Sequence, residues 1–172
     1  SVLTLKEVKN LFPDPDIDLA NAAADAKNIY FGYTFFPQPL KKMPVKKRTQ
    51  IKEARLKILE EKGFFKKIDP DIFETINDFY DIDPPVDELI QSSKGTYFFQ
   101  TVAENDGVSR RYPLVGKYEN RLFPNAGLAL ALDHYGVSLE DVEIIPGKHL
   151  LIPFSSPDEY GTIISILVGC ND

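Results

Sequence analysis

The chain contains only two histidines in 172 residues, so a mechanism that uses an imidazole as general base must depend on one of them. Asp133 precedes His134, and a carboxylate that orients a histidine is part of hydrolase catalysis. Both histidines also have a structural explanation. His134 ends an apolar run, where a cation suits the negative end of a helix dipole, and His149 begins an apolar strand. We therefore assign no catalytic residue and keep a hydrolase-type enzyme using Asp133, His134 or His149 as an alternative.

The single cysteine, Cys170, restricts redox and metal chemistry. One cysteine cannot form a disulfide within the chain, and it cannot build a cysteine-based zinc site. We expect the protein in the cytoplasm or in another reducing compartment.

No common metal or cofactor motif is complete. The aspartates of segment 14–18, together with Asp25, are spaced like the ligands of a calcium-binding loop, but Leu19 stands where that loop needs glycine. No glycine-rich phosphate loop, dinucleotide fingerprint or zinc-hydrolase pair occurs in the sequence. We expect no metal and no cofactor.

Charge is distributed unevenly along the chain. Residues 41–67 contain eleven basic and three acidic residues, a net charge of +8, whereas the whole chain carries −6. Residues 68–91 follow directly with eight acidic residues and no lysine or arginine. Such clusters produce a local potential that steers partners and holds counter-charges.

Three interpretations of this segregation stay open. The two segments can pack side by side and neutralise each other, leaving solvated faces without a function. The acidic segment can form a surface that recognises a basic protein. The basic segment, next to the aromatic residues of 30–36, can hold a nucleic-acid backbone or phosphate, although the acidic remainder of the chain would repel a polyanion.

We favour the second interpretation, a non-enzymatic protein-binding module such as an inhibitor, an immunity-type protein or an assembly subunit. The expected partner-binding residues are acidic: Asp71, Glu74, Asp78, Asp81, Asp83 and Asp87. The alternative anion-binding residues are basic: Lys41, Lys42, Lys46, Lys47, Arg48, Lys52 and Arg55.

Apolar spacing and prolines predict helices for most of the first half of the chain. The expected helices are 4–12, a second one beginning at Asp18, then 49–62, 69–80 and 83–90. Residues 30–44 combine clustered aromatic residues with three prolines, which predicts an extended segment that packs its rings and then follows the surface.

After Gly95 the apolar period shortens toward two, which is typical of strands. The Asp-Gly pair at 106–107 predicts a hairpin between strands 97–103 and 108–115. Residues 125–135 are apolar on nearly every side, so we expect a buried helix there.

Three further strands are expected near the end of the sequence, at 142–145, 149–154 and 162–169. The last two are apolar enough to be central strands, and a hairpin between them would place His149 near Ile166.

These elements predict a single α+β domain over 1–172, helix-rich in 1–92 and strand-rich in 95–170. The helical N-terminal half would pack on an antiparallel or mixed sheet of about five strands from the C-terminal half. The longest mainly apolar stretch, 162–170, is about half of what a helix needs to cross a bilayer, so no membrane partner is expected.

Overall fold

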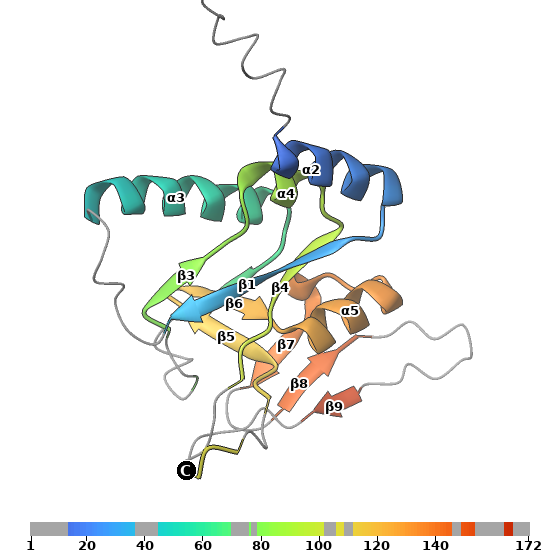
Figure 1. Ribbon diagram of the computed structural model, residues 1–172. Helices are drawn as coiled ribbons and strands as arrows, with labels where there is room; N and C mark the ends of the chain where they lie inside the picture. Colours follow the sequence, from blue (N-terminus) through green and yellow to red (C-terminus); the bar gives the residue numbers. More distant parts are fainter. Residues whose placement is uncertain are drawn as a thin grey trace, which may run out of the picture.

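A computed structural model describes residues 14–36, 45–69, 76, 79–101, 106–108, 112–145, 149–153 and 164–166 (Figure 1). The side chains of 45–48 and 164–166 are not among the parts described. The helices are α2 (Pro15–Ala26), α3 (Val45–Glu61), α4 (Asp87–Ser92) and α5 (Ala126–Tyr135), with a 3-10 turn at Leu139–Asp141. The strands are β1 (Tyr30–Phe36), β2 (Lys66–Lys67), β3 (Asp81–Asp83), β4 (Gly95–Phe98), β5 (Val115–Tyr118), β6 (Arg121–Pro124), β7 (Glu143–Ile145), β8 (His149–Ile152) and β9 (Ile164–Ile166).

The fold is mixed α+β, as expected, but the described strands form three small sheets instead of one sheet of about five strands. The strand orders are β3-β1-β4, β2-β6-β5 and β7-β8-β9. The first sheet is mixed, because β1 is antiparallel to β3 and parallel to β4. The segment before β3 joins the first two sheets: the Phe79 N–H donates to the Lys117 carbonyl at 2.9 Å, and the Tyr80 N–H to the Phe36 carbonyl at 2.9 Å.

The expectation of a helical N-terminal half is wrong, because β1, β2 and β3 lie in that half. The aromatic residues explain β1. Tyr33 and Phe35 are buried and alternate with more exposed neighbours, so their period of two directs the run into the middle of a sheet, in agreement with the expected extended segment that packs its rings. Residues 37–44 and the expected helix 4–12 lie outside the described residues.

Two other helices begin at residues that differ from the expectation. Proline is the first residue of one of them, and two prolines precede the other. α2 begins at Pro15 instead of Asp18, and Asp14 caps it by accepting the Asp16 N–H at 3.1 Å. The helix expected from residue 83 begins only at Asp87, because Asp83 pairs in β3 and two prolines follow it.

The helix expected over 69–80 lies mostly outside the described residues. Its final residues, Phe79 and Tyr80, are not helical and donate their backbone N–H groups to neighbouring strands. Pairing with β5 and β1 therefore prevails there over the helical spacing of the apolar residues.

Among the described residues, the two strands expected to form a hairpin around 106–107 do not pair with each other; 102–105 and 109–111 lie outside the described residues. β4 pairs with β1, and β5 pairs with β6 through the turn at 119–120. A two-residue turn closes a much shorter loop than a connection through 99–114, which favours the β5–β6 hairpin. β6 was not among the expected strands; it ends at a proline, which is unusual within a sheet.

The last part of the chain agrees more closely with the sequence. α5 lies within the expected helix, and the three expected strands appear as the antiparallel sheet β7-β8-β9. The expectation that this helix is buried is wrong, because only Leu128 and Leu132 are buried and Leu130 is 47% exposed. The hairpin register differs by one residue, with Leu150 instead of His149 opposite Ile166. β8 is central as expected, but β9 is at the edge of the described sheet.

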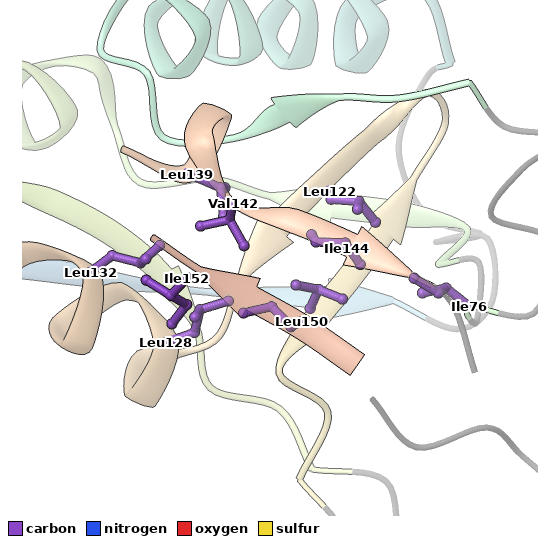
Figure 2. Close-up of a cluster of buried hydrophobic side chains, with 10 residues drawn as sticks. Ile76, Leu122, Leu128, Leu132, Leu139, Val142, Ile144, Leu150 and Ile152 are labelled. Atoms are coloured by element: carbon purple, nitrogen blue, oxygen red, sulfur yellow. The ribbon is translucent and has the colours of Figure 1, made fainter. Parts of the chain in front are cut away.

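Two apolar clusters hold these layers together. In one, Leu128 and Leu132 of α5 pack with Leu150 and Ile152 of β8 and with Leu122 of β6 (Figure 2). The second cluster is aromatic and lies between α3 and the first two sheets. The helix contributes Leu56 and Leu59 to it, so α3 is fixed by its apolar face and its polar sides are left for other contacts. None of the described helices has the length and apolar character needed to span a bilayer.

Candidate functional site

The structure describes three of the six acidic residues expected to bind a partner, Asp81, Asp83 and Asp87. Asp71, Glu74 and Asp78 lie outside the described residues. Asp81 is buried, and one carboxylate oxygen accepts the Ile82 N–H at 2.9 Å. Asp83 and Asp87 retain 67% and 52% of their side-chain exposure, so these two are available at the surface.

The basic and acidic segments meet at Arg55 of α3. Its Nη1 lies 3.9 Å from Asp83 Oδ1, and its Nε lies 3.6 Å from Asp87 Oδ1. The same Nη1 donates to the Pro84 carbonyl at 3.4 Å. Arg55 therefore offsets part of the acidic charge, which corresponds locally to the neutralising interpretation.

Beside Arg55, a groove of about 440 Å³ runs between α3 and the start of α4. Its lining is apolar at Ile51, Ala54 and Val86, and acidic at Asp87 and Glu88. Ile51 is 43% exposed, which is high for a large aliphatic side chain beside a groove. Glu88 is exposed and makes no ion pair within the described part of the chain. The groove thus combines an apolar surface with unneutralised negative charge.

A second acidic element, α2, packs beside α4 (Figure 1). It buries only Ala20 and Ala23. Its acidic side chains are all exposed: Asp14, Asp16, Asp18 and Asp25. The sequence reading considered these aspartates only as cap or calcium-loop residues, and it did not place them next to α4. The helix itself argues against a calcium loop, because Asp16, Asp18 and Asp25 lie in regular helix.

The described part of the chain offers no cluster of three or more histidine, cysteine or carboxylate side chains that could hold a metal ion. Within the described residues, the acidic surface beside the groove therefore offers negative charge but no such cluster of ligands.

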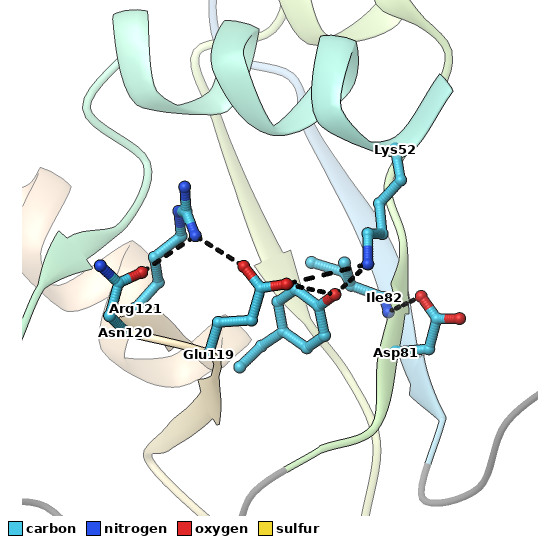
Figure 3. A network of polar contacts seen from close by, with 7 residues as sticks. Lys52, Asp81, Ile82, Glu119, Asn120 and Arg121 are labelled. Carbon is cyan, nitrogen blue, oxygen red and sulfur yellow. Dashed lines mark hydrogen bonds and ion pairs between the residues drawn. The ribbon is translucent and has the colours of Figure 1, made fainter. Parts of the chain in front are cut away.

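The other side of α3 contacts the β5–β6 hairpin through a polar network (Figure 3). The Lys52 amine contacts the Tyr118 hydroxyl, which donates to Glu119 Oε1 at 3.0 Å. Arg121 Nη1 donates to Glu119 Oε2 at 2.9 Å and to Asn120 Oδ1 at 3.0 Å. Glu119 has φ 53°, a backbone region that is unfavourable for a residue with a side chain.

This network lines a hollow of about 310 Å³ that contains equal numbers of basic and acidic side chains. The lining residues are Thr49, Lys52, Glu53, Leu56, Lys57, Glu60, Glu119 and Arg121. With balanced charges, the hollow has no electrostatic preference for an anion.

The basic residues expected for anion binding divide into three groups. Lys41 and Lys42 lie outside the described residues, and Lys46, Lys47 and Arg48 are described only by their backbone in the first turn of α3. Lys52 and Arg55 are paired within the chain, as shown above.

The histidine alternative has weak geometric support. Asp133 is bound by Lys94, whose Nζ lies 2.6 Å from Asp133 Oδ2, and this contact lowers the pKa of Asp133 and raises the pKa of Lys94. His134 stands in the last turn of α5, its ring edge-on to Tyr135 at 4.9 Å. His149 lies in β8 opposite Ile145. Lys94 directly precedes β4, so its contact with the Asp133 carboxylate links α5 to the start of that strand.

Comparison with known proteins adds no family to this description. No protein-family model, curated protein or solved structure matches the chain. The features of the molecule that bear on function are therefore the groove between α3 and α4, its acidic rim and the exposed aspartates of α2.

Proposed function

We propose that this protein is a non-enzymatic binding module whose α3–α4 groove receives a basic, partly apolar segment of another protein. An inhibitor, an immunity-type protein or an assembly subunit would have this kind of surface. The observation that supports the proposal is the combination of exposed Ile51 with the carboxylates of Asp87 and Glu88 in one groove.

The apolar part of the groove supplies affinity. Burying one leucine-sized side chain contributes about 1.5–3 kcal/mol, and a volume of about 440 Å³ is in the range of sites that hold a small ligand or a few side chains. Ile51, Ala54 and Val86 would contact such a side chain.

The acidic part supplies specificity and speeds association. Glu88 has no cationic partner among the described residues, and the exposed aspartates of α2 lie on a helix that packs beside α4. A basic partner is attracted over roughly one Debye length, about 8 Å at physiological salt, before the apolar contacts form.

The test uses a fluorescein-labelled hexapeptide that alternates leucine and arginine, with binding followed by fluorescence anisotropy. We expect binding that weakens with added salt, and a loss of at least about tenfold in affinity for Glu88→Lys. Glu140→Lys is the matched control: it also reverses an exposed carboxylate, but in the 3-10 turn, and should leave the affinity unchanged. A peptide affinity that is insensitive to Glu88→Lys would contradict the proposal.

Nucleic-acid or phosphate binding is the alternative, and the paired state of Lys52 and Arg55 leaves it with less support. It would depend on Lys46, Lys47 and Arg48, in a first helical turn that contains no acidic residue. Labelled single-stranded and double-stranded oligonucleotides, tested in the same assay at low salt, discriminate the two proposals. Tight oligonucleotide binding that survives Glu88→Lys would favour the alternative.

A further inference from the structure

We infer that Arg55 is an internal placeholder: in the free protein it occupies the cationic position between Asp83 and Asp87 that an arginine of the partner takes in the complex. The inference rests on the proposed function and specifies the chemistry of the partner, a guanidinium group next to an apolar side chain.

The geometry around Arg55 is that of a loosely held cation. A strong ion pair between guanidinium and carboxylate has N–O distances of about 2.7–2.9 Å and is often bidentate. Arg55 is 3.6 Å from Asp87 and 3.9 Å from Asp83, and it reaches each carboxylate with a single nitrogen. Its hydrogen bond to the Pro84 carbonyl is also long, at 3.4 Å. The two carboxylates therefore retain acceptor positions that Arg55 does not use.

The difference in exposure indicates the side from which a competitor would approach. The Arg55 side chain is 22% exposed, whereas those of Asp83 and Asp87 are 67% and 52% exposed. Arg55 thus contacts the aspartates from the buried side, next to α3, whereas the two carboxylates are largely open to solvent on their outer faces. An incoming guanidinium could bind these outer faces in the planar, two-nitrogen manner that an ammonium group cannot reproduce.

The ion pair of Lys52 with Glu119, which also joins α3 to the rest of the chain, is less open to such an exchange. Lys52 is held by both Tyr118 and Glu119, and Glu119 is held in turn by Arg121. The hollow beside that network has balanced charges, unlike the groove beside Arg55. Arg55 is the described basic residue of α3 that lines the apolar, acidic groove.

Such a placeholder has a measurable cost for the partner. An internal group that occupies the binding position competes with the ligand. The apparent affinity of the ligand then equals its intrinsic affinity multiplied by the fraction of time for which the position is free. If Arg55 occupies the position for about nine-tenths of the time, its removal should tighten binding about tenfold.

The experiment compares the wild-type protein with Arg55→Gln and Arg55→Met, using the labelled leucine–arginine hexapeptide and a version with citrulline in place of arginine. Citrulline keeps the shape of arginine but has no charge. We expect both variants to bind the arginine peptide about tenfold more tightly than the wild type, and the citrulline peptide to bind all three proteins weakly. Arg55→Met retains an unbranched apolar side chain along α3 if Arg55→Gln fails to fold, which circular dichroism will show.

A second readout does not depend on removing the side chain. In a ¹⁵N NMR spectrum of the wild-type protein, the Arg55 Nε–H signal should shift and exchange faster with water as the arginine peptide is added, because the peptide displaces this group. Unchanged or weaker peptide binding in both Arg55 variants, or an unaltered Arg55 signal in the bound state, would overturn the inference. If Glu88→Lys still abolishes binding in that case, the proposed function stands; if Glu88→Lys has no effect, the proposed function fails as well.

Discussion

Replacing Tyr33 by phenylalanine should make the protein more stable. Tyr33 is 2% exposed, and its hydroxyl has no hydrogen-bond partner among the described residues. A buried hydroxyl without a partner loses its bonds to water on folding, which costs about 1–3 kcal/mol. Phenylalanine avoids that cost and keeps the edge-on ring contacts to Phe35 at 5.7 Å and to Phe123 at 5.9 Å.

The expected gain for Tyr33→Phe is about 1 kcal/mol in the free energy of unfolding, taken from the lower end of that range because the hydroxyl oxygen itself occupies packed space. For a chain of this length, such a gain raises the melting temperature by about 2–4 °C. Urea denaturation followed by circular dichroism measures it as a higher midpoint at unchanged slope.

Tyr118→Phe is the matched control, because Tyr118 is equally buried but its hydroxyl contacts Lys52 and donates to Glu119. Losing those bonds leaves charged groups with one partner fewer, so the midpoint should fall by the equivalent of about 1 kcal/mol. The two substitutions remove the same atom and should act in opposite directions. A clear loss of stability in Tyr33→Phe would show that the hydroxyl is bonded in the folded protein and would refute the reasoning.

Three further predictions concern pH and backbone packing. Burial raises the pKa of Tyr33 well above its usual value near 10, so folding favours the neutral phenol. The stability of the wild type should therefore fall as the pH rises above about 10, and that of Tyr33→Phe should fall less steeply. Melting curves at alkaline pH measure this difference. Lys94 holds the pKa of Asp133 below its usual range, so Asp133→Asn should be less stable than the wild type above about pH 4. Melting temperatures measured at decreasing pH should show the difference between the two proteins shrinking below about pH 4. Gly116→Ala should lower the melting temperature, by the equivalent of about 1–3 kcal/mol, because its new methyl group would meet the rings of Phe35 and Phe79 at 2.8 and 3.1 Å. The control is Gly127→Ala, at an exposed helical position with 3.5 Å to the nearest neighbour, which should raise the melting temperature slightly. An equal effect of the two alanines would contradict this account.

Local signals allowed some elements to be predicted and left others out of reach. The position of α5, though not its burial, is confirmed because its start and stop signals are local: Asn125 caps it by accepting the Leu128 N–H, and Gly136 ends it with φ 65°. By contrast, β1 and β4 pair across a large sequence separation, Tyr30 with Gly95, and no nearby turn residue specifies that partnership. The same limitation explains why the pairing of β4 with β1 was not expected.

The candidate site was also only partly predictable, because its residues are brought together by contacts between segments that the sequence does not place relative to each other. The sequence shows that charge is sorted between 41–67 and 68–91, but the distance between the two segments depends on how α3 packs against α4. The contact of Arg55 with Asp83 and Asp87 results from tertiary packing, since apolar residues such as Leu56 and Leu59 set the rotation of α3. α2 was not assigned to the acidic surface, because nothing in its sequence indicates which helix it packs against.

The pairing of β1 with β4 has a consequence for synthesis. β1 is a run of seven uncharged residues, five of them aromatic, and during translation it leaves the ribosome well before Gly95–Phe98 exists to cover its edge. Uncharged, aromatic segments of this length are typical of chains that assemble into amyloid-like stacks. We therefore expect that fast completion of the chain, which lets β4 cover this edge, limits the pairing of β1 with a neighbouring molecule.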